Sequence, residues 1–425
     1  MIADLMTLFK STFSPSKILE LARQLGAIQR LRNIHPADLC SALVGCAMGD
    51  EERSIATARR LYGQLAGYAP EESSFYDRFN AGLSKLMKAL YQQALPDATH
   101  EQRAAVGAVL DDLEVKDILA VDGSQVMLPK TAYAILPSTS TDHGGFKVTA
   151  TLSVAYQALR RIDVTDARTH DRKALKLDRW LHNQLLLFDR GYCDHTLFAE
   201  IEDRKGHFLA RLKTASKPTI ATICDGLGQP ELGKPLLNHP RYSENLDIDA
   251  AFSIRGCQPR TFRVVCVSVL QIVDDGTPSY VDIWLVTNLS SEQVSAEQLA
   301  TLYRMRWDVE ILFKIVKSVA RMDQLRSANQ NVIEAFLYAS LIGLVLAQGI
   351  CAQMRRERPD VEPSLYRVTA LVLGYLPQIL RASTAGRYRK VIESFHRALW
   401  REGANPNPGR PYRATQYARE FLVPD

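Results

Sequence analysis

Two short apolar runs that each end in an aspartate decide the expected fold: Ile118-Leu119-Ala120-Val121-Asp122 and Leu185-Leu186-Leu187-Phe188-Asp189. Uninterrupted apolar runs of this length, ended by turn-forming residues, are typical of strands buried in the middle of a parallel or mixed sheet. A carboxylate at the end of such a strand lies at the open edge of the sheet, where sites in α/β proteins usually form. The sequence therefore predicts that Asp122 and Asp189 meet at one sheet edge.

A third carboxylate, Glu310, belongs to the pattern Tyr303-x2-Arg306-x3-Glu310-x6-Lys317. At about 100° per helical residue these four side chains share one face, with Trp307 and Lys314 beside them. The opposite face is apolar, from Leu302, Met305, Val309, Ile311, Leu312, Ile315 and Val316. A charged helix face taken alone is usually a solvated one, but the spacing favours a functional face. Ser295 and Gln298 predict a capping box where this helix begins.

The pattern Tyr-x2-Arg-x3-Glu-x6-Lys is identified as the signature of bacterial DDE transposases of the insertion-sequence-four, or YREK, family. Two further blocks are similar to that family. Val121-Asp122-Gly123-Ser124 resembles its first-aspartate block, and Phe188-Asp189-Arg190-Gly191-Tyr192 resembles its Asp-x-Gly-Tyr block. The resemblance covers roughly residues 115–330 in the same order as in the family.

The resemblance implies an α/β fold with a ribonuclease-H-like catalytic core that a β-rich insertion interrupts; the pattern of elements alone indicates α/β. We expect strands over 117–122, 146–155, 158–165, 184–189 and 207–212, and helices over 171–182 and 194–203. Apolar stretches 262–269 and 280–286 flank a turn signal at 274–278 and predict a hairpin. The expected domains are a helical N-terminal DNA-binding region (1–100), the core in two parts (101–212 and 283–354), the insertion (213–282) and a basic helical C-terminal region for dimerisation or DNA contact (355–425).

The N-terminal region is expected to form short helices after Ser14-Pro15, over 36–48, over 52–65 and from Ser73-Ser74 onward. Such helices fit a helix-turn-helix-like DNA reader, with the fourth as its recognition helix. They fit a plain packing domain equally well, because Phe75 and Phe79 have core spacing. Both interpretations stay open on the sequence.

Charge is unevenly distributed over the 425 residues, although the net value is only +5. Between Arg381 and Glu420 nine basic residues stand against three acidic ones, a local excess of +6. This basic stretch suits an anionic polymer such as DNA; a solvated surface helix is the alternative.

Residues 335–354 carry no charge and are about as long as a membrane span. Polar residues and glycines dilute this run, so we expect a helix buried against the sheet and no membrane partner. The N-terminus lacks the pattern of a signal peptide. The seven cysteines have no zinc-binding spacing, which favours reduced thiols in a cytosolic protein. The resemblance implies a bacterial protein of the cytoplasm that associates with the nucleoid.

The resemblance implies phosphodiester chemistry with two Mg²⁺ ions per site, which Mn²⁺ can replace. Such ions, about 3.5–4 Å apart, activate the attacking oxygen and stabilise the leaving one. Asp122 is expected to bridge both ions, with Asp189 on one and Glu310 on the other. The expected DNA contacts come from Tyr303, Arg306, Trp307, Lys314, Lys317, Arg190 and Tyr192. Lys147 and His143 are expected at the surface.

The expected function is that of an insertion-sequence transposase. It would bind terminal inverted repeats in double-stranded DNA, nick the element ends by hydrolysis and join the freed 3′-OH to target DNA. Cut-and-paste movement, a hairpin intermediate and a homodimeric synaptic complex are what the family implies. The alternatives are a ribonuclease-H-like nuclease without strand transfer and a domesticated, non-catalytic DNA-binding protein.

Overall fold

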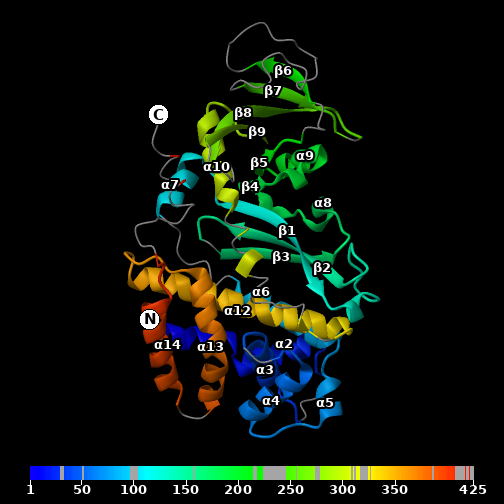
Figure 1. Cartoon of the computed structure of the whole chain (residues 1–425), viewed down its shortest axis with the longest axis vertical. Helices are drawn as coiled ribbons and strands as arrows, with labels where there is room; N and C mark the ends of the chain where they lie inside the picture. The colour runs from blue at the N-terminus through cyan, green and yellow to red at the C-terminus, as the bar shows by residue number, and fades with distance from the viewer. Residues whose placement is uncertain are drawn as a thin grey trace.

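The expected strands join one mixed sheet of nine strands in a computed structural model of the chain (Figure 1). The structure describes residues 1–28, 33–49, 52–95, 104–156, 158–213, 218–223, 246–254, 256–272, 278–307, 310, 313–315, 324–325, 327–384, 387–406, 417 and 421. The strands are β1 (Ile118–Leu128), β2 (Gly144–Ser153), β3 (Ala158–Asp166), β4 (Leu185–Phe188), β5 (His207–Arg211), β6 (Thr219–Ile223), β7 (Asp247–Phe252), β8 (Arg260–Ile272) and β9 (Pro278–Thr287).

Strand order identifies the core. The sheet runs β3-β2-β1-β4-β5-β9-β8-β7-β6, with β1, β4 and β5 parallel and β2, β3 and β9 antiparallel to their neighbours. Three antiparallel strands followed by two parallel ones are the ribonuclease-H-like arrangement, so the predicted fold class is confirmed. The hairpin of β8 and β9 is present as predicted, although its turn lies outside the described residues. The insertion continues the core sheet, because β9 pairs with β5.

The helical elements are α1 (Ile2–Thr12), α2 (Pro15–Gln24), α3 (Pro36–Ala47), α4 (Ile55–Ala66), α5 (Glu72–Tyr76), α6 (Ala81–Ala94), α7 (Ala104–Asp112), α8 (Asp171–Ala174), α9 (His195–Asp203), α10 (Ala296–Arg304), α12 (Gln330–Glu357), α13 (Leu365–Thr384) and α14 (Tyr388–Glu402), with 3₁₀ turns η2 (Lys130–Ala132), η3 (Arg179–Leu181), η4 (Arg190–Tyr192) and η6 (Met305–Trp307). Figure 1 shows the N-terminal and C-terminal helices in one layer on one side of α12, with the sheet on the other. The two terminal regions therefore pack together.

The long helix α12 is the centre of the helical layer. It packs on α3, α6 and α13, and its Gln348 side chain accepts a hydrogen bond from the Leu159 amide of β3 at 3.3 Å. By length and composition this helix is able to cross a membrane, but its apolar window is wholly buried in the fold. The expected buried helix is thus confirmed, with helices covering it more than the sheet does.

Two expected elements are wrong. The helix expected over 171–182 is two short pieces, α8 and η3, separated by extended residues. The Asp178 side chain accepts a hydrogen bond from the Arg179 amide, and local bonds of this kind compete with helix continuation. Strand β1 does not end at Asp122 but continues to Leu128, because β2 stays paired with it along that length.

The helix expected from Ser73-Ser74 onward, the fourth of the predicted N-terminal helices, corresponds to α5 and has only five residues. The rings of Phe75 and Phe79 are buried and lie 5.9 Å apart, and Phe79 stacks on Phe336 of α12 at 6.5 Å. Both phenylalanines therefore stabilise the helical layer, as the packing interpretation expects.

Candidate active site

The two aspartates lie side by side where the parallel pairing of β1 and β4 stops. Val121 is opposite Phe188 in the last paired position, so Asp122 and Asp189 are the next residues on neighbouring strands. Neighbouring strands are about 4.8 Å apart. Side chains alternate between the two faces of a sheet, and Ile118, Ala120, Leu185 and Leu187 pack in the large core. Both aspartates therefore belong to that same face.

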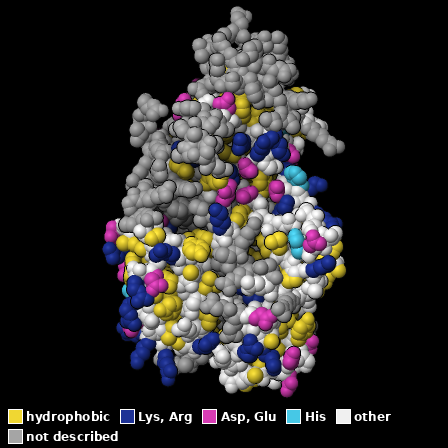
Figure 2. Space-filling view, viewed as in Figure 1, with side chains coloured by type: hydrophobic (Ala, Val, Ile, Leu, Met, Phe, Trp, Pro, Cys, Tyr) yellow, Lys and Arg dark blue, Asp and Glu magenta, His cyan; other side chains and the backbone are white. Residues whose placement is uncertain are grey.

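The third carboxylate reaches this face from the segment after α10. The capping box of Ser295 and Gln298 is present as predicted and fixes where α10 begins. The turn η6 follows α10 and contacts β1 and β4. Arg306 Nη2 donates to Glu310 Oε1 at 3.2 Å, and the Tyr303 hydroxyl donates to Asp189 Oδ1 at 3.4 Å. Figure 2 shows Asp and Glu side chains gathered near the middle of the visible face, with Lys and Arg side chains around them.

The expected uninterrupted helix with one charged face is wrong at residues 305–307, which form a 3₁₀ turn. Met305 and Arg306 are both buried in this turn, which contacts β1 and β4. Arg306 is only 5% exposed and Tyr303 is 6% exposed, whereas Trp307 is 45% exposed. The predicted face thus divides into a buried part and a surface part. Lys314 is exposed, and Lys317 lies outside the described residues.

Burial and like charge raise the pKa of Asp122 to about 6. Burial is the largest cause, and the nearby Asp189 and Glu310 add to it. The Gly123 amide, which donates to Asp122 Oδ1 at 2.8 Å, and the Arg306 guanidinium act in the opposite direction. Burial also raises the pKa of Tyr303 to about 12, so its hydroxyl remains a donor for Asp189. At neutral pH three carboxylates share one guanidinium, which favours a cation between them.

The donor chemistry fits a hard divalent cation, because Mg²⁺ prefers carboxylate oxygens. Within the described ranges, no three Asp, Glu, His or Cys side chains are already grouped closely enough to hold a metal ion. The fit therefore rests on charge and on the repulsion that Asp122 experiences from its neighbours.

A sequence model of the family described as "Transposase DDE domain" matches residues 114–346, more than half of the chain. The chain belongs to this family. Among curated relatives, the transposase for insertion sequence element IS231F of Bacillus thuringiensis subsp. israelensis is 35% identical over 94 residues, 21% of this chain and 20% of that protein. The transposase for IS1151 of Clostridium perfringens is 37% identical over 97 residues, 22% of this chain and 20% of that protein.

A longer alignment joins the chain to the transposase for IS231B of Bacillus thuringiensis subsp. berliner, at 20% identity over 411 residues, 87% of this chain and 84% of that protein. The alignments with the first two relatives span only about a fifth of their length. These names agree with the resemblance to insertion-sequence-four transposases.

On the other face of β1, this DDE domain packs a glycine tightly. A Cβ atom on Gly123 would lie 2.7 Å from Asp171 Oδ1 and 3.3 Å from the Tyr192 hydroxyl. Asp171 is held by Lys147, whose Nζ donates to Asp171 Oδ1 at 2.9 Å and to the Thr169 carbonyl at 2.6 Å. Lys147, whose side chain is 16% exposed, is therefore a partly buried ion-pair partner of Asp171 rather than the exposed surface residue that was expected.

Tyr192 also lies on this face. Its ring is 2% exposed and stacks on Phe188 with ring centroids 5.3 Å apart. The prediction that Tyr192 contacts DNA directly is therefore wrong, because its side chain is buried. Arg190, two residues earlier, is exposed and keeps that candidate role. Sequence reasoning missed Asp171, because no spacing relates α8 to β2.

Replacing Gly123 with alanine is expected to lower DNA cleavage about 10-fold or more, because the added methyl displaces Asp171 and shifts the neighbouring Asp122. Cleavage rates of the purified variant would test this. Gly374→Ala in α13 is the matched control, since nothing lies within 4 Å of its added Cβ. Equal rates for Gly123→Ala and the wild type would show that the close approach is not needed.

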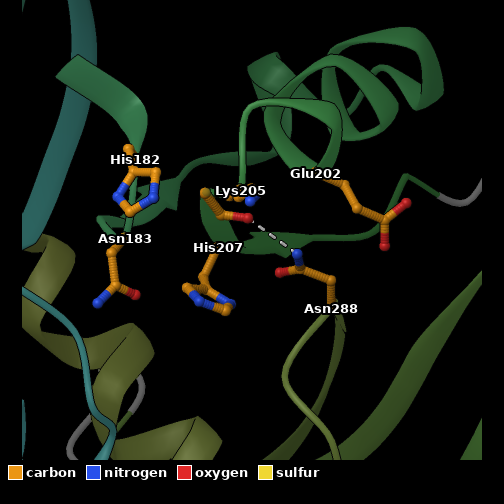
Figure 3. Close-up of a pocket in the computed structure, with 7 residues that line it drawn as sticks. His182, Asn183, Glu202, Lys205, His207 and Asn288 are labelled. Atoms are coloured by element: carbon orange, nitrogen blue, oxygen red, sulfur yellow. Dashed lines mark hydrogen bonds between the residues drawn. The ribbon is translucent and has the colours of Figure 1, made fainter. Parts of the chain in front are cut away.

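A separate hollow of about 340 Å³ lies at the opposite, N-terminal ends of β4 and β5 (Figure 3). His182, Asn183, Lys205 and His207 face it, and Asn288 closes one side by donating to the Gly206 carbonyl at 3.0 Å. Burial lowers the pKa of His207. Sites of α/β sheets form at the carboxyl ends of parallel strands, so the carboxylates mark the reactive edge of this domain.

Proposed function

We propose that the chain is the transposase of an insertion sequence and that it cuts and joins DNA by metal-dependent phosphoryl transfer. The observation that carries the proposal is the meeting of Asp122 and Asp189 at adjacent strand positions, facing Arg306 and Glu310. Family membership supports the same reaction. The substrate is double-stranded DNA with the terminal inverted repeats of the element, and the protein works in the bacterial cytoplasm at the nucleoid.

Asp122, Asp189 and Glu310 are the residues that would hold Mg²⁺ or Mn²⁺ ions. The ions supply Lewis-acid activation of the attacking oxygen and stabilise the leaving oxygen. The Tyr303 hydroxyl fixes the orientation of the Asp189 carboxylate through its hydrogen bond. The protein's own contribution is to bring the two aspartates to adjacent strand positions and to hold Asp189 and Glu310 through Tyr303 and Arg306.

Arg306 takes a different role from the surface phosphate contact that the spacing suggested. Its guanidinium lies over the rings of Tyr303 and Trp307, at 5.7 and 5.1 Å from their centroids, and is bonded to Glu310. Arg306 Nε is buried and has no hydrogen-bond partner among the residues that the structure describes. Because that atom is enclosed within the site, we assign Arg306 to positioning: it holds Glu310 and favours the charged form of Asp122.

The exposed residues around the site provide the proposed DNA surface. Trp307 presents an exposed ring for stacking on an unpaired base, and Lys314 and Arg190 present cations for the flanking phosphates. Lys317 shares this proposed role, on the sequence pattern alone. The basic residues after Arg381 and the N-terminal helices are proposed to bind DNA or a second copy, so that a homodimer holds both element ends. Arg410, Arg413 and Arg419 of that stretch lie outside the described residues.

The test is cleavage of a supercoiled plasmid that carries the element's own flanking repeats, in Mg²⁺ or EDTA, by wild type and Glu310→Gln. Metal-dependent cuts at the repeat ends, absent in Glu310→Gln, are expected, followed by joining of the 3′-OH ends to a second plasmid. Excision as a linear or hairpin-ended fragment would establish cut-and-paste movement. Cutting without joining would instead identify a nuclease, and binding without cutting would identify a non-catalytic DNA-binding protein.

A further inference from the structure

The end of the described chain returns to α10 (Figure 1). Helix α14 ends at Glu402 in the helical layer, whereas Tyr417 and Phe421 lie against α10. The Arg304 guanidinium lies 4.2 Å from the centroid of the Tyr417 ring. Gln298 Nε2 donates to the Phe421 carbonyl at 3.1 Å, and the Phe421 side chain is 1% exposed. Apolar burial, a cation–π contact and a hydrogen bond thus attach the tail to one helix.

These contacts engage both ends of α10. The side-chain oxygen and nitrogen of Gln298 bind different partners. Its Oε1 accepts from the Ser295 amide at 2.9 Å to close the capping box, while its Nε2 binds the tail. Arg304 is the last residue of α10 and immediately precedes the turn η6 that carries Arg306. The tail therefore contacts the first turn of the helix and the residue that leads into the active site.

A helix of nine residues is too short to hold its place by its own hydrogen bonds. Its position depends on tertiary contacts, and α10 has them with β5 and β8 on the sheet side. The tail packs on α10 as well, since Phe421 belongs to the same core cluster as Leu299 and Leu302. Tyr303, which bonds Asp189, is the next residue along from Leu302.

We propose that Tyr417 and Phe421 form a C-terminal clamp that positions α10 for DNA cleavage, with Gln298 and Arg304 as the positioning residues that receive it. The proposal rests on the proposed function, because the helix it positions carries Tyr303 and leads into the segment that holds Arg306 and Glu310. The clamp acts on the rate of the chemical step. Tyr417 and Phe421 are not themselves among the proposed DNA contacts.

The deciding variant is Gln298→Glu in the full chain. Glutamate keeps the acceptor for the Ser295 amide, and a negative charge suits the first turn of a helix, so the capping box survives. It offers no N–H to the Phe421 carbonyl, so the clamp alone is weakened. Tyr417→Ala removes the ring beneath Arg304, and Tyr417→Phe is its matched control because it keeps the ring.

We expect hydrogen exchange in residues 296–304 to become faster in Gln298→Glu and Tyr417→Ala, and to stay unchanged in Tyr417→Phe. The rate of end cleavage at saturating DNA should fall about 10-fold in the first two variants, with unchanged affinity for the element ends. The thermal midpoint of Gln298→Glu should match that of the wild type. A positioning role predicts a lower cleavage rate with unchanged DNA affinity. A general loss of stability does not predict this combination.

Two results would overturn the clamp. Unchanged exchange in α10 would show that the tail does not hold the helix, and faster exchange with a full or raised cleavage rate would show that the tail does not assist cleavage. If the wild-type protein cuts no DNA under Mg²⁺ or Mn²⁺, the proposed function fails. The exchange measurement still decides in that case whether the tail holds α10.

Discussion

Replacing Asp122 with asparagine is expected to abolish DNA cleavage and at the same time to make the protein more stable near neutral pH. The pKa of Asp122 is raised to about 6 in the folded protein, from an ordinary value of 3.8. Between those two values the folded state holds a proton that the unfolded state has released, so stability falls as pH rises through this window. At neutral pH the ionised carboxylate therefore destabilises the fold by about 2–3 kcal/mol. Asparagine removes that charge and keeps an oxygen for the Gly123 amide.

Thermal unfolding at pH 7.5 and at pH 4 measures this effect. The midpoint of Asp122→Asn should exceed that of the wild type by a few degrees at pH 7.5, and the difference should largely vanish at pH 4, where the wild-type carboxyl is protonated. Asp112→Asn, at an exposed position at the end of α7, should show no such difference. Added Mg²⁺ should stabilise the wild type more than Asp122→Asn. A less stable Asp122→Asn at pH 7.5 would contradict the strain we ascribe to the clustered carboxylates.

Replacing Arg306 with alanine is expected to lower cleavage by about 100-fold or more and to move the acid side of its pH profile to higher pH. The loss follows because Arg306 no longer holds Glu310 beside the two aspartates. The shift follows because Arg306 lowers the pKa of Asp122, so without it a higher pH is needed to ionise that carboxyl. Arg306→Lys should restore part of the rate, since lysine returns the charge without the planar fork.

Cleavage rates of the three proteins between pH 5.5 and 9, at fixed Mg²⁺, test this expectation. Lys314→Ala is the control for a surface cation. It should weaken DNA binding and reduce its salt dependence while leaving the pH profile in place. An Arg306→Ala profile that keeps the wild-type acid side would place Arg306 outside the electrostatic surroundings of Asp122.

The sequence predicts the sheet well because the signals are local. The runs that end at Asp122 and Asp189 carry their own burial pattern, and parallel pairing then brings the two carboxylates together whatever the intervening chain does. The break at η6 was not predictable, because it depends on contacts of that turn with β1 and β4. Without those contacts, the helical spacing placed Arg306 at the surface.

The remaining differences have the same physical origin. The pair of Lys147 and Asp171 joins β2 to α8, and no periodicity relates the two. The contacts of Tyr417 and Phe421 with α10 arise in a proline-rich stretch without a repeating apolar pattern, where only the folded chain reveals what each ring covers. Sequence patterns therefore identify residues that act from regular elements and miss those whose partners come from elsewhere in the fold.

The pairing of β5 with β9 brings together two segments that are far apart in the sequence. The Leu212 amide donates to the Trp284 carbonyl at 2.8 Å, so the chain leaves the core and re-enters it at almost the same point. The two ends of the segment between these residues are thus joined by strand pairing. The conformational entropy lost when a loop is closed rises only slightly with the length of the loop. Loops beyond β8 and β9 are therefore expected to tolerate changes of length, whereas β8 itself contacts α10 and helps to place the segment that carries Glu310.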